Sequence, residues 1–422
     1  MKQTLIPVAI AFCLLVFTSV NRAQTTEIFL PGKPITISLS PDEARAFSLE
    51  MKADDYAEVT WLANDNLVLS FGFLDSSGKV ISLGDSTSND SAVFIAPKAG
   101  KYSFLVKYDK SPELTGQQRV SLEYSNKFSL PKGSKQKDIR RINGFDVRIM
   151  YAPDVDQDYG DNVVLFEKSG ILKGILRQGG NATYMGFSFP DNAVEAKTLI
   201  AKKQVNLIRN TLDKTGDRIP DVMIDYFSGG AHCCFSTYFV NLADAVDVLE
   251  VLNTDNASLA VIGVNPKGGL RFATNENAFA YWNIHYAGSP MPDVILEFQN
   301  GELRPNFELM KKPAPSLARL KAKARAASLK ISNDLYNEVG MDFEEAFWSE
   351  MLDLIYSGHE DLAWQYFELV WPTKKTGKEK FTADFKEALA ESYYGTRAIN
   401  TSNSMRNSMR LFEKIYKGIR EQ

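Results

Sequence analysis

The sequence predicts a multidomain protein in which a β-sandwich and a second β-rich domain precede an all-α helical domain. Three observations predict this order. Apolar and polar residues alternate in short runs over 28–126, strand-like runs broken by Gly and Asn recur over 145–312, and helical spacing occupies 313–422. A chain of 422 residues has room for about three domains. Its composition, 44% hydrophobic and 24% charged, is that of a folded protein.

Residues 1–23 have the composition of a secretory signal peptide. Lys2 precedes an uncharged apolar run from Leu5 to Phe17, and Ala23 suits the position before a cleavage site. This run is shorter than the roughly 20 apolar residues that a membrane helix needs. We therefore expect cleavage near Ala23, a secreted or periplasmic protein, and no membrane span in the mature chain.

The first β-rich segment, 28–126, shows the alternation of half-buried strands, for example over 35–39 and 102–106. Turn residues separate these runs, which favours a sandwich of short strands. The pieces at 34–39, 73–80 and 96–102 resemble bacterial pre-peptidase C-terminal domains. The resemblance implies a jelly-roll-like accessory module that serves adhesion, targeting or spacing rather than catalysis.

The segment 127–144 is rich in basic residues placed among Pro, Gly and Ser. These are Lys127, Lys132, Lys135, Lys137, Arg140 and Arg141. Phe128 is the one aromatic residue in this segment, so the basic residues have few rings beside them with which to form a binding face. We therefore expect a solvated linker. A basic patch that binds anions is the alternative.

The second β-rich segment contains one run with the spacing of a cation-binding loop. Asp213, Thr215, Asp217 and Asp221 place side-chain oxygens at loop positions 1, 3, 5 and 9, and the Ile219 carbonyl falls at position 7. Calcium takes six to eight hard oxygen ligands, and alternate residues of a tight loop can supply them. The spacing therefore predicts a calcium site followed directly by a strand.

This loop resembles the calcium loop of FG-GAP repeats in integrin-type propellers. Two positions depart from that pattern: Thr215 replaces a carboxylate or amide, and Arg218 stands where Gly usually allows the turn. With only three carboxylates, we expect weak affinity. The alternative is an Asp-rich surface turn whose carboxylates cap backbone amides. The nearby acidic group Asp154, Asp156, Asp158 and Asp161 is expected to be a solvated turn, since its glycine is misplaced for an ion loop.

The strand after the loop leads into Gly229-Gly230-Ala231-His232-Cys233-Cys234. This order resembles uncharacterised secreted bacterial proteins with a single FG-GAP-like unit, a likeness that implies no activity. Cys233 and Cys234 are candidates for a vicinal disulfide. The alternatives are buried thiols, a soft-metal site that includes His232, and a thiolate nucleophile. The nucleophile would use His285 as its base and Asp293 to orient that base.

After Pro313 and Pro315 the apolar spacing becomes helical. Leu317, Leu320, Ala324 and Ala327 share one helical face, and a second such face runs from Phe343 to Ile355. Further helices are expected over 359–370, 379–394 and 404–420.

Charge and motif content indicate the class of function. A net charge of −4 argues against nucleic-acid binding, which requires a basic face. The sequence carries no P-loop, dinucleotide fingerprint, H-E-x-x-H or G-x-S-x-G motif. We therefore expect a non-enzymatic binding protein whose partner is an unknown protein or cell-envelope ligand. The alternative is a thiol-dependent hydrolase that uses Cys233 or Cys234 with His285.

Overall fold

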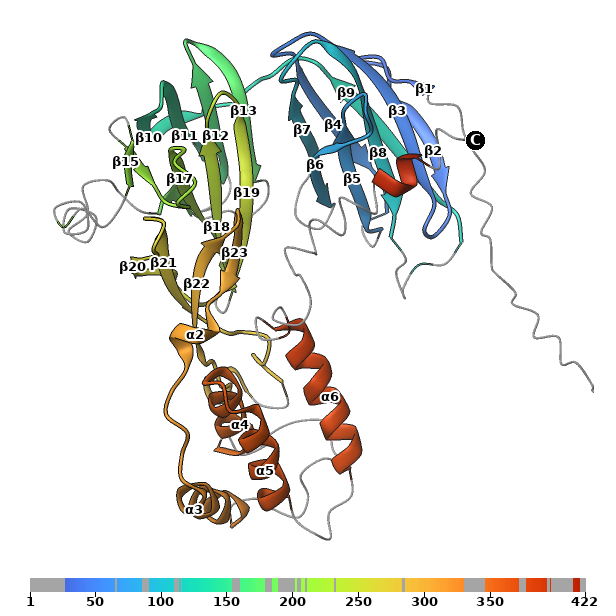
Figure 1. Cartoon of the computed structure of the whole chain (residues 1–422). Helices are drawn as coiled ribbons and strands as arrows, with labels where there is room; N and C mark the ends of the chain where they lie inside the picture. Colours follow the sequence, from blue (N-terminus) through green and yellow to red (C-terminus); the bar gives the residue numbers. More distant parts are fainter. Residues whose placement is uncertain are drawn as a thin grey trace, which may run out of the picture.

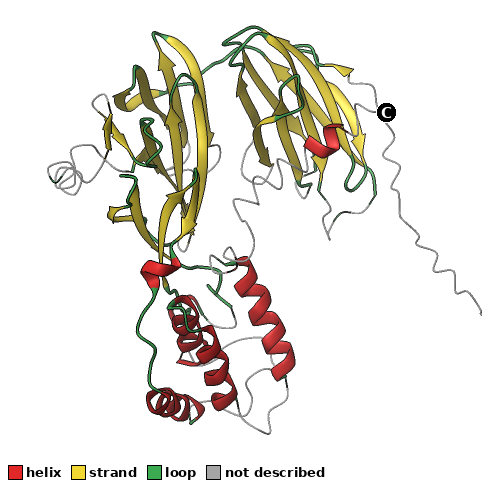
Figure 2. Ribbon diagram, viewed as in Figure 1, coloured by secondary structure: helices red, strands yellow, loops and turns green. Residues whose placement is uncertain are grey.

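The computed structural model of the chain describes residues 27–64, 67–85, 91–109, 114, 116–153, 160–178, 184–188, 202, 206–208, 211–230, 233–282, 285–329, 346–371, 377–392, 395 and 413–417. Strands dominate the first three quarters of the chain, and the helices gather near its end (Figure 2). The prediction of a β-rich, multidomain chain with a helical C-terminal region is thereby confirmed. The likeness to FG-GAP repeats stays a prediction.

The first β-rich part consists of two sheets whose strands pair antiparallel, except that the edge strand β1 pairs with β3 in parallel. One sheet has the order β1-β3-β8-β5-β6, and the other has the order β2-β9-β4-β7. The strands are β1 (Glu27–Ile28), β2 (Ile35–Leu39), β3 (Ala44–Met51), β4 (Tyr56–Leu62), β5 (Leu69–Leu74), β6 (Val80–Asp85), β7 (Ser91–Ile95), β8 (Gly100–Tyr108) and β9 (Gln118–Ser125).

The two sheets enclose an aromatic-rich core, as the alternation in the sequence indicates. Phe47 on β3 pairs with Phe104 on β8, and Phe73 on β5 pairs with the same Phe104. All three rings are buried in one cluster with Val59 and Leu122 of the opposite sheet. Alternate residues of each strand therefore form the interior of this sandwich.

The second β-rich part is built from three further sheets and a two-stranded ribbon (Figure 1). Its first strands are β10 (Lys135–Ile142), β11 (Phe145–Pro153), β12 (Gly160–Lys168), β13 (Ile171–Gln178), β14 (Tyr184–Phe187), β15 (Asn206–Ile208), β16 (Thr211–Asp213), β17 (Asp221–Gly230), β18 (Cys233–Leu242) and β19 (Val246–Asp255). The last four are β20 (Ala260–Val264), β21 (Leu270–Asn275), β22 (Asp293–Gln299) and β23 (Glu302–Pro305).

The central sheet of this part, β14-β17-β18-β19, is covered on both faces. Val222 and Ile224 of β17 pack against the β10-β11-β12-β13 sheet. Met223, between them, points to the opposite face and packs with Phe272 and Leu296 of the β20-β21-β22-β23 sheet. A strand buried on both faces has a continuous apolar sequence rather than an alternating one.

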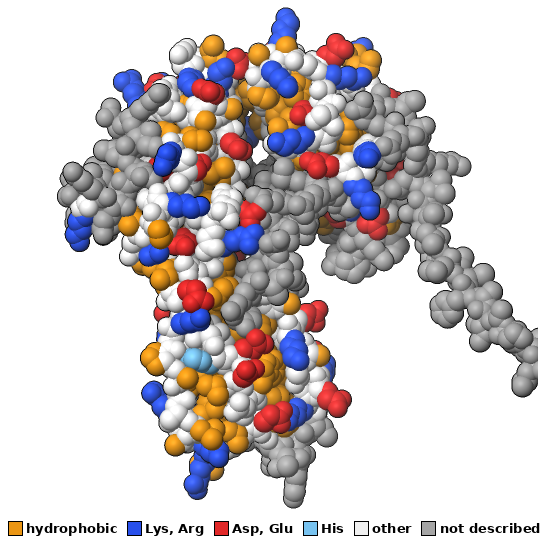
Figure 3. All heavy atoms as spheres, viewed as in Figure 1, with side chains coloured by type: hydrophobic (Ala, Val, Ile, Leu, Met, Phe, Trp, Pro, Cys, Tyr) orange, Lys and Arg blue, Asp and Glu red, His pale blue; other side chains and the backbone are white. Residues whose placement is uncertain are grey.

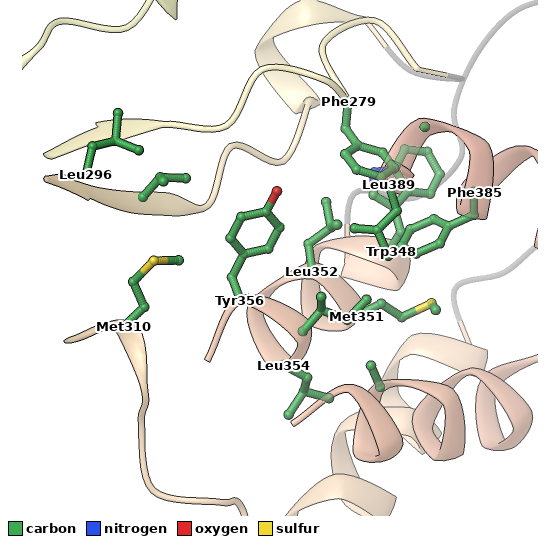
Figure 4. Close-up of a cluster of buried hydrophobic side chains, with 14 of the residues drawn as sticks. Phe279, Leu296, Met310, Trp348, Met351, Leu352, Leu354, Tyr356, Phe385 and Leu389 are labelled. Carbon is green, nitrogen blue, oxygen red and sulfur yellow. The ribbon is translucent and has the colours of Figure 1, made fainter. Parts of the chain in front are cut away.

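The helices share one core with the last sheet. They are η1 (Tyr286–Gly288), α2 (Phe307–Met310), α3 (Leu317–Ser328), α4 (Ala346–Tyr356), α5 (Glu360–Val370) and α6 (Lys378–Glu391). Trp348, Leu352 and Phe385 lie in the same buried cluster as Phe279 and Leu296 (Figure 4). The expected face of α3 is confirmed at Leu320, Ala324 and Ala327, which are buried, but the first residue of the helix, Leu317, is exposed.

The segment 127–144, expected as a linker, contains strand β10 over Lys135–Ile142. Strand β10 forms the edge of its sheet and pairs with β11 alone. Lys137 lies 4.2 Å above the ring of Tyr184, and Arg140 lies 4.4 Å above the ring of Phe187. Charged residues protect an edge strand from further pairing, which explains why this strand has the composition of a linker.

The surface carries both signs of charge. On the face drawn in Figure 3, basic and acidic side chains are interspersed over the β-rich parts and the helices. Two ion pairs join the first sandwich to β13: Lys173 with Asp54, at 2.6 Å, and Arg177 with Glu58. Among the described helices, none combines the length and apolar character required to cross a membrane.

Candidate metal centre

The loop between β16 and β17 brings three carboxylates together. Asp213 is the last residue of β16 and Asp221 is the first residue of β17, so the two strands bring the ends of the loop together. One oxygen from each of Asp213, Asp217 and Asp221 lies within 4.8 Å of the other two. Asp213 and Asp221 are fully buried, and Asp217 is exposed. This is the convergence of oxygen donors that a cation requires.

Backbone amides hold each carboxylate in place. Asp213 accepts from Gly216 N at 2.6 Å through Oδ1 and from Arg218 N at 2.8 Å through Oδ2. Asp221 Oδ2 accepts from Lys214 N at 2.9 Å and from Thr215 N at 3.0 Å. These bonds satisfy the carboxylates in part and fix their direction. Because both bonds to Asp221 end on Oδ2, its Oδ1 can still accept from a ligand.

The turn is made by two residues in the left-handed region. Gly216 has a φ of +85° and Arg218 has a φ of +71°. Glycine adopts this conformation without strain, whereas arginine does so at a cost. Arg218, the position at which the sequence departs from the FG-GAP pattern, therefore adopts a backbone conformation that favours glycine.

Thr215 contacts the carboxylate group through its hydroxyl, and Ile219 contacts it through its backbone N–H. The Thr215 hydroxyl is 3.5 Å from Asp213 Oδ1, and Thr215 itself is buried. Ile219 donates its N–H to Asp217 Oδ1 at 2.8 Å. Both residues therefore border the carboxylate group. The carboxylates also accept hydrogen bonds from backbone amides of the loop, as the alternative interpretation of an Asp-rich turn requires.

Asn241 is a member of the site that the loop spacing does not indicate. It lies on β18 directly opposite Asp221. Its Nδ2 donates to Asp217 Oδ2 at 3.0 Å and approaches Asp221 Oδ1 at 3.4 Å. Asn241 thus links two of the three carboxylates from a neighbouring strand.

Lys214 places a positive charge beside the carboxylates. Its side chain is buried, with 1% of the residue exposed, and Nζ donates to the Asp221 carbonyl at 2.8 Å. Its charge acts to lower the pKa of Asp221. Three carboxylates and one ammonium leave two negative charges, which a divalent cation would balance.

Burial makes these carboxylates reluctant to ionise on their own. It raises the pKa of Asp221 to about 7, and the neighbouring Asp217 charge acts in the same direction. Asp217 is exposed, but partial desolvation of its carboxyl also raises its pKa, and the charge of Asp213 acts in the same direction. Crowded buried carboxylates of this kind are stabilised by a cation that binds among them.

The loop rests against the turn between β20 and β21. Leu270 donates its N–H to the Lys214 carbonyl at 2.8 Å. A Cβ on Gly269 would lie 2.6 Å from the Thr215 carbonyl oxygen, so only glycine fits there. Asn265 Oδ1 shapes this turn by accepting from Lys267 N at 2.9 Å and Gly269 N at 3.0 Å.

The thiol hypothesis is only partly visible in the structure. Residue His232 and the side chains of Cys233 and Cys234 lie outside the described part of the chain. His285 is exposed at the start of η1. Within the described residues, Asp293 Oδ1 accepts from Asn275 Nδ2 at 3.1 Å, and no hydrogen bond joins Asp293 to His285. The vicinal disulfide and the nucleophile both stay predictions.

The second acidic group is described at one position. Asp154, Asp156 and Asp158 lie outside the described residues, and Asp161 lies on β12, opposite Ala152 of β11. Within the described residues, the group of carboxylates that could hold a metal ion is Asp213, Asp217 and Asp221.

Several solved structures resemble part of this chain, and two of them are described here. No family model and no curated protein matches the chain. A periplasmic inhibitor of g-type lysozyme from Aeromonas hydrophila is 19% identical with a TM-score of 0.20, over 24% of this chain and 95% of its own. The pre-peptidase C-terminal domain of a collagenase from Bacillus anthracis is 17% identical with a TM-score of 0.21, over 25% of this chain and 99% of its own.

Proposed function

We propose that this chain is a secreted or periplasmic, non-enzymatic binding protein in which the Asp213–Asp221 loop holds one calcium ion in a structural role. The observation that carries the proposal is the meeting of three carboxylates within 4.8 Å, two of them buried. The ligands would be Asp213, Asp217 and Asp221, together with the Thr215 hydroxyl and the Ile219 carbonyl.

The donor set favours calcium over softer metals. Carboxylate, hydroxyl and carbonyl oxygens are hard ligands, and the loop offers neither a thiolate nor an imidazole. Calcium also tolerates the irregular coordination that a nine-residue loop provides, whereas magnesium requires near-octahedral geometry. The Lys214 ammonium beside the site and the small number of carboxylates support weak affinity.

The structural role follows from what the loop joins. Its ends are β16 and β17, Asn241 attaches it to β18, and Leu270 attaches it to β21. An ion held by this loop would therefore stabilise the contact between the central sheet and the β20-β21-β22-β23 sheet. The first sandwich and the exposed surface of the other parts would then bind the partner. The mixed charge of the surface suits a protein or cell-envelope ligand.

Calorimetric titration of the calcium-free protein tests the ion proposal. Wild type should bind one equivalent of calcium, and Asp217→Ala should lose at least about tenfold in affinity, because one charged ligand is removed. Asp244→Asn is the matched control, since it removes a carboxylate charge from a fully exposed position in the same part of the chain. The absence of binding heat in wild type would contradict the proposal.

A further inference from the structure

The outer face of the β1-β3-β8-β5-β6 sheet is apolar, which is unusual for a sandwich. The outer face of an antiparallel sheet normally meets water and is polar. Here Ala46, Leu74, Val80 and Leu105 are buried on the face away from the sandwich core, and they form a cluster of their own. Leu105 on β8 follows the inward-facing Phe104, so this strand is apolar on both faces.

The residues that cover this face come from the opposite end of the chain. Residues 413–417 form a short helical turn, which we call the 413–417 turn. Figure 1 shows it in red against the sheet that contains β5 and β8. Tyr416 is 6% exposed and joins the apolar cluster, and Ile415 packs beside it.

Polar contacts fix the position of the turn on the sheet. The hydroxyls of Tyr416 and Ser103 lie 2.6 Å apart, and Ser103 is buried on β8. Val80 donates its N–H to Glu413 Oε1 at 3.3 Å. Apolar contact and two specific hydrogen bonds therefore act together at one small surface.

The surface is also shaped to receive an aromatic ring. Gly78 has a φ of +84°, and a Cβ at this position would lie 3.0 Å from Tyr416 Cδ1. Ala46 and Ser103, which lie beside Tyr416 on the sheet, have small side chains, so the turn can approach the strands closely. The face therefore fits the tyrosine ring through both its shape and its hydrogen bonding.

We propose that this outer face is a docking surface for the 413–417 turn, with Tyr416 as the side chain it recognises, so that the turn acts as a releasable strap that fastens the end of the chain to the first sandwich. A helical turn of five residues is unstable in isolation, so its formation and its docking must occur together. The contact is small compared with the cores of the sandwiches, and a contact of this size opens without unfolding them.

Hydrogen exchange in the full chain tests the strap. In wild type the Val80 amide is protected by Glu413, so release of the turn should expose it. Tyr416→Ala should accelerate Val80 amide exchange by about tenfold or more, since it truncates a buried aromatic side chain. Lys414→Ala is the control, because Lys414 is exposed on the same turn. Exchange in Tyr416→Ala equal to that in wild type would overturn the proposal.

A double-mutant cycle tests the recognised hydroxyl without removing the ring. Tyr416→Phe and Ser103→Ala should each accelerate Val80 exchange roughly two- to tenfold, and the double variant should show little more than either single change. Fully additive effects would mean that the two hydroxyls do not interact. Light scattering distinguishes docking within one chain from exchange between copies: a wild-type monomer supports the proposal, and a dimer that Tyr416→Ala dissociates contradicts it.

Discussion

Gly269 contacts the backbone of the Asp213–Asp221 loop, which we call the ion loop. Because a Cβ there would lie 2.6 Å from the Thr215 carbonyl oxygen, any side chain must displace the loop backbone. We expect Gly269→Ala to lower the free energy of unfolding by about 1–3 kcal/mol, the usual cost of overpacking, and to weaken calcium binding.

Gly263 provides the matched control for that substitution. It lies on β20 of the same sheet, with open space where a Cβ would stand. Gly263→Ala should change the free energy of unfolding by less than about 1 kcal/mol. Urea-induced unfolding of both variants checks the prediction, and equal effects would show that the contact with Thr215 is unimportant.

Asp225 gives a pH dependence separate from the ion site. Burial raises the pKa of this carboxyl, which accepts a hydrogen bond from Thr237 Oγ1 at 2.6 Å. The folded protein therefore retains the proton to higher pH than the unfolded chain. This contribution to stability is complete below about pH 4 and is lost as pH rises through the folded pKa.

Asp225→Asn removes that titration while keeping the shape of the side chain. We expect wild type to lose free energy of unfolding relative to Asp225→Asn as pH rises from about 4 to 8. Urea unfolding of both proteins at several pH values measures the difference in their free energies of unfolding. Groups that titrate equally in both proteins cancel from this difference. A difference that stays constant over this range would contradict the assignment.

At the residue scale, loop spacing predicts the meeting of Asp213, Asp217 and Asp221, because alternate residues of one tight loop point to a common centre. Asn241 could not be predicted in this way, since it reaches the site through strand pairing. Nor does counting residues back along the two strands from the β17–β18 turn identify Asn241 as the partner of Asp221. A bulge between Phe227 and Gly230 shifts the pairing by one residue.

At the element scale, α4 is attached to the β-sheet part through a buried polar contact. The Tyr356 hydroxyl donates to Glu276 Oε2 at 2.5 Å and lies 3.0 Å from Ser392 Oγ. Figure 4 shows this side chain between the helices and the strands that carry Leu296. A single hydroxyl therefore joins the turn after β21, α4 and the end of α6.

Removal of that hydroxyl should loosen the helices. Tyr356→Phe leaves the buried Glu276 carboxylate without one donor, so we expect a loss of about 1–3 kcal/mol in the free energy of unfolding. Tyr184→Phe is the control, because its ring is 45% exposed. Circular dichroism during urea unfolding measures the stability of both variants. Equal free energies of unfolding for Tyr356→Phe and wild type would show that the contact contributes nothing.

Element type was predictable where one pattern dominates, as in the alternating strands of the first sandwich and the spaced apolar residues of α3. Prediction failed for β10 because its basic residues, which protect a sheet edge, give it the composition of a linker. The docking of the 413–417 turn could not be predicted either, since Leu105 signals burial without identifying what covers it.

At the scale of the whole molecule, the central sheet, the β20-β21-β22-β23 sheet and the helices share one apolar core. The first sandwich has a separate core. Elements that share a core unfold together, so the ion loop should influence the stability of the helices although it lies in the β-rich part. The sandwich should be affected much less.

Differential scanning calorimetry of the full chain, with and without calcium, tests whether an ion in the Asp213–Asp221 loop stabilises the core that the loop's sheets share with the helices. At about a hundred times its dissociation constant, a ligand that binds only the folded state stabilises it by about 2.7 kcal/mol. Calcium should therefore raise the transition temperature of the part that contains the loop and the helices in wild type, and not in Asp217→Ala. Identical wild-type transition temperatures with and without excess calcium would show that the loop binds no stabilising calcium ion.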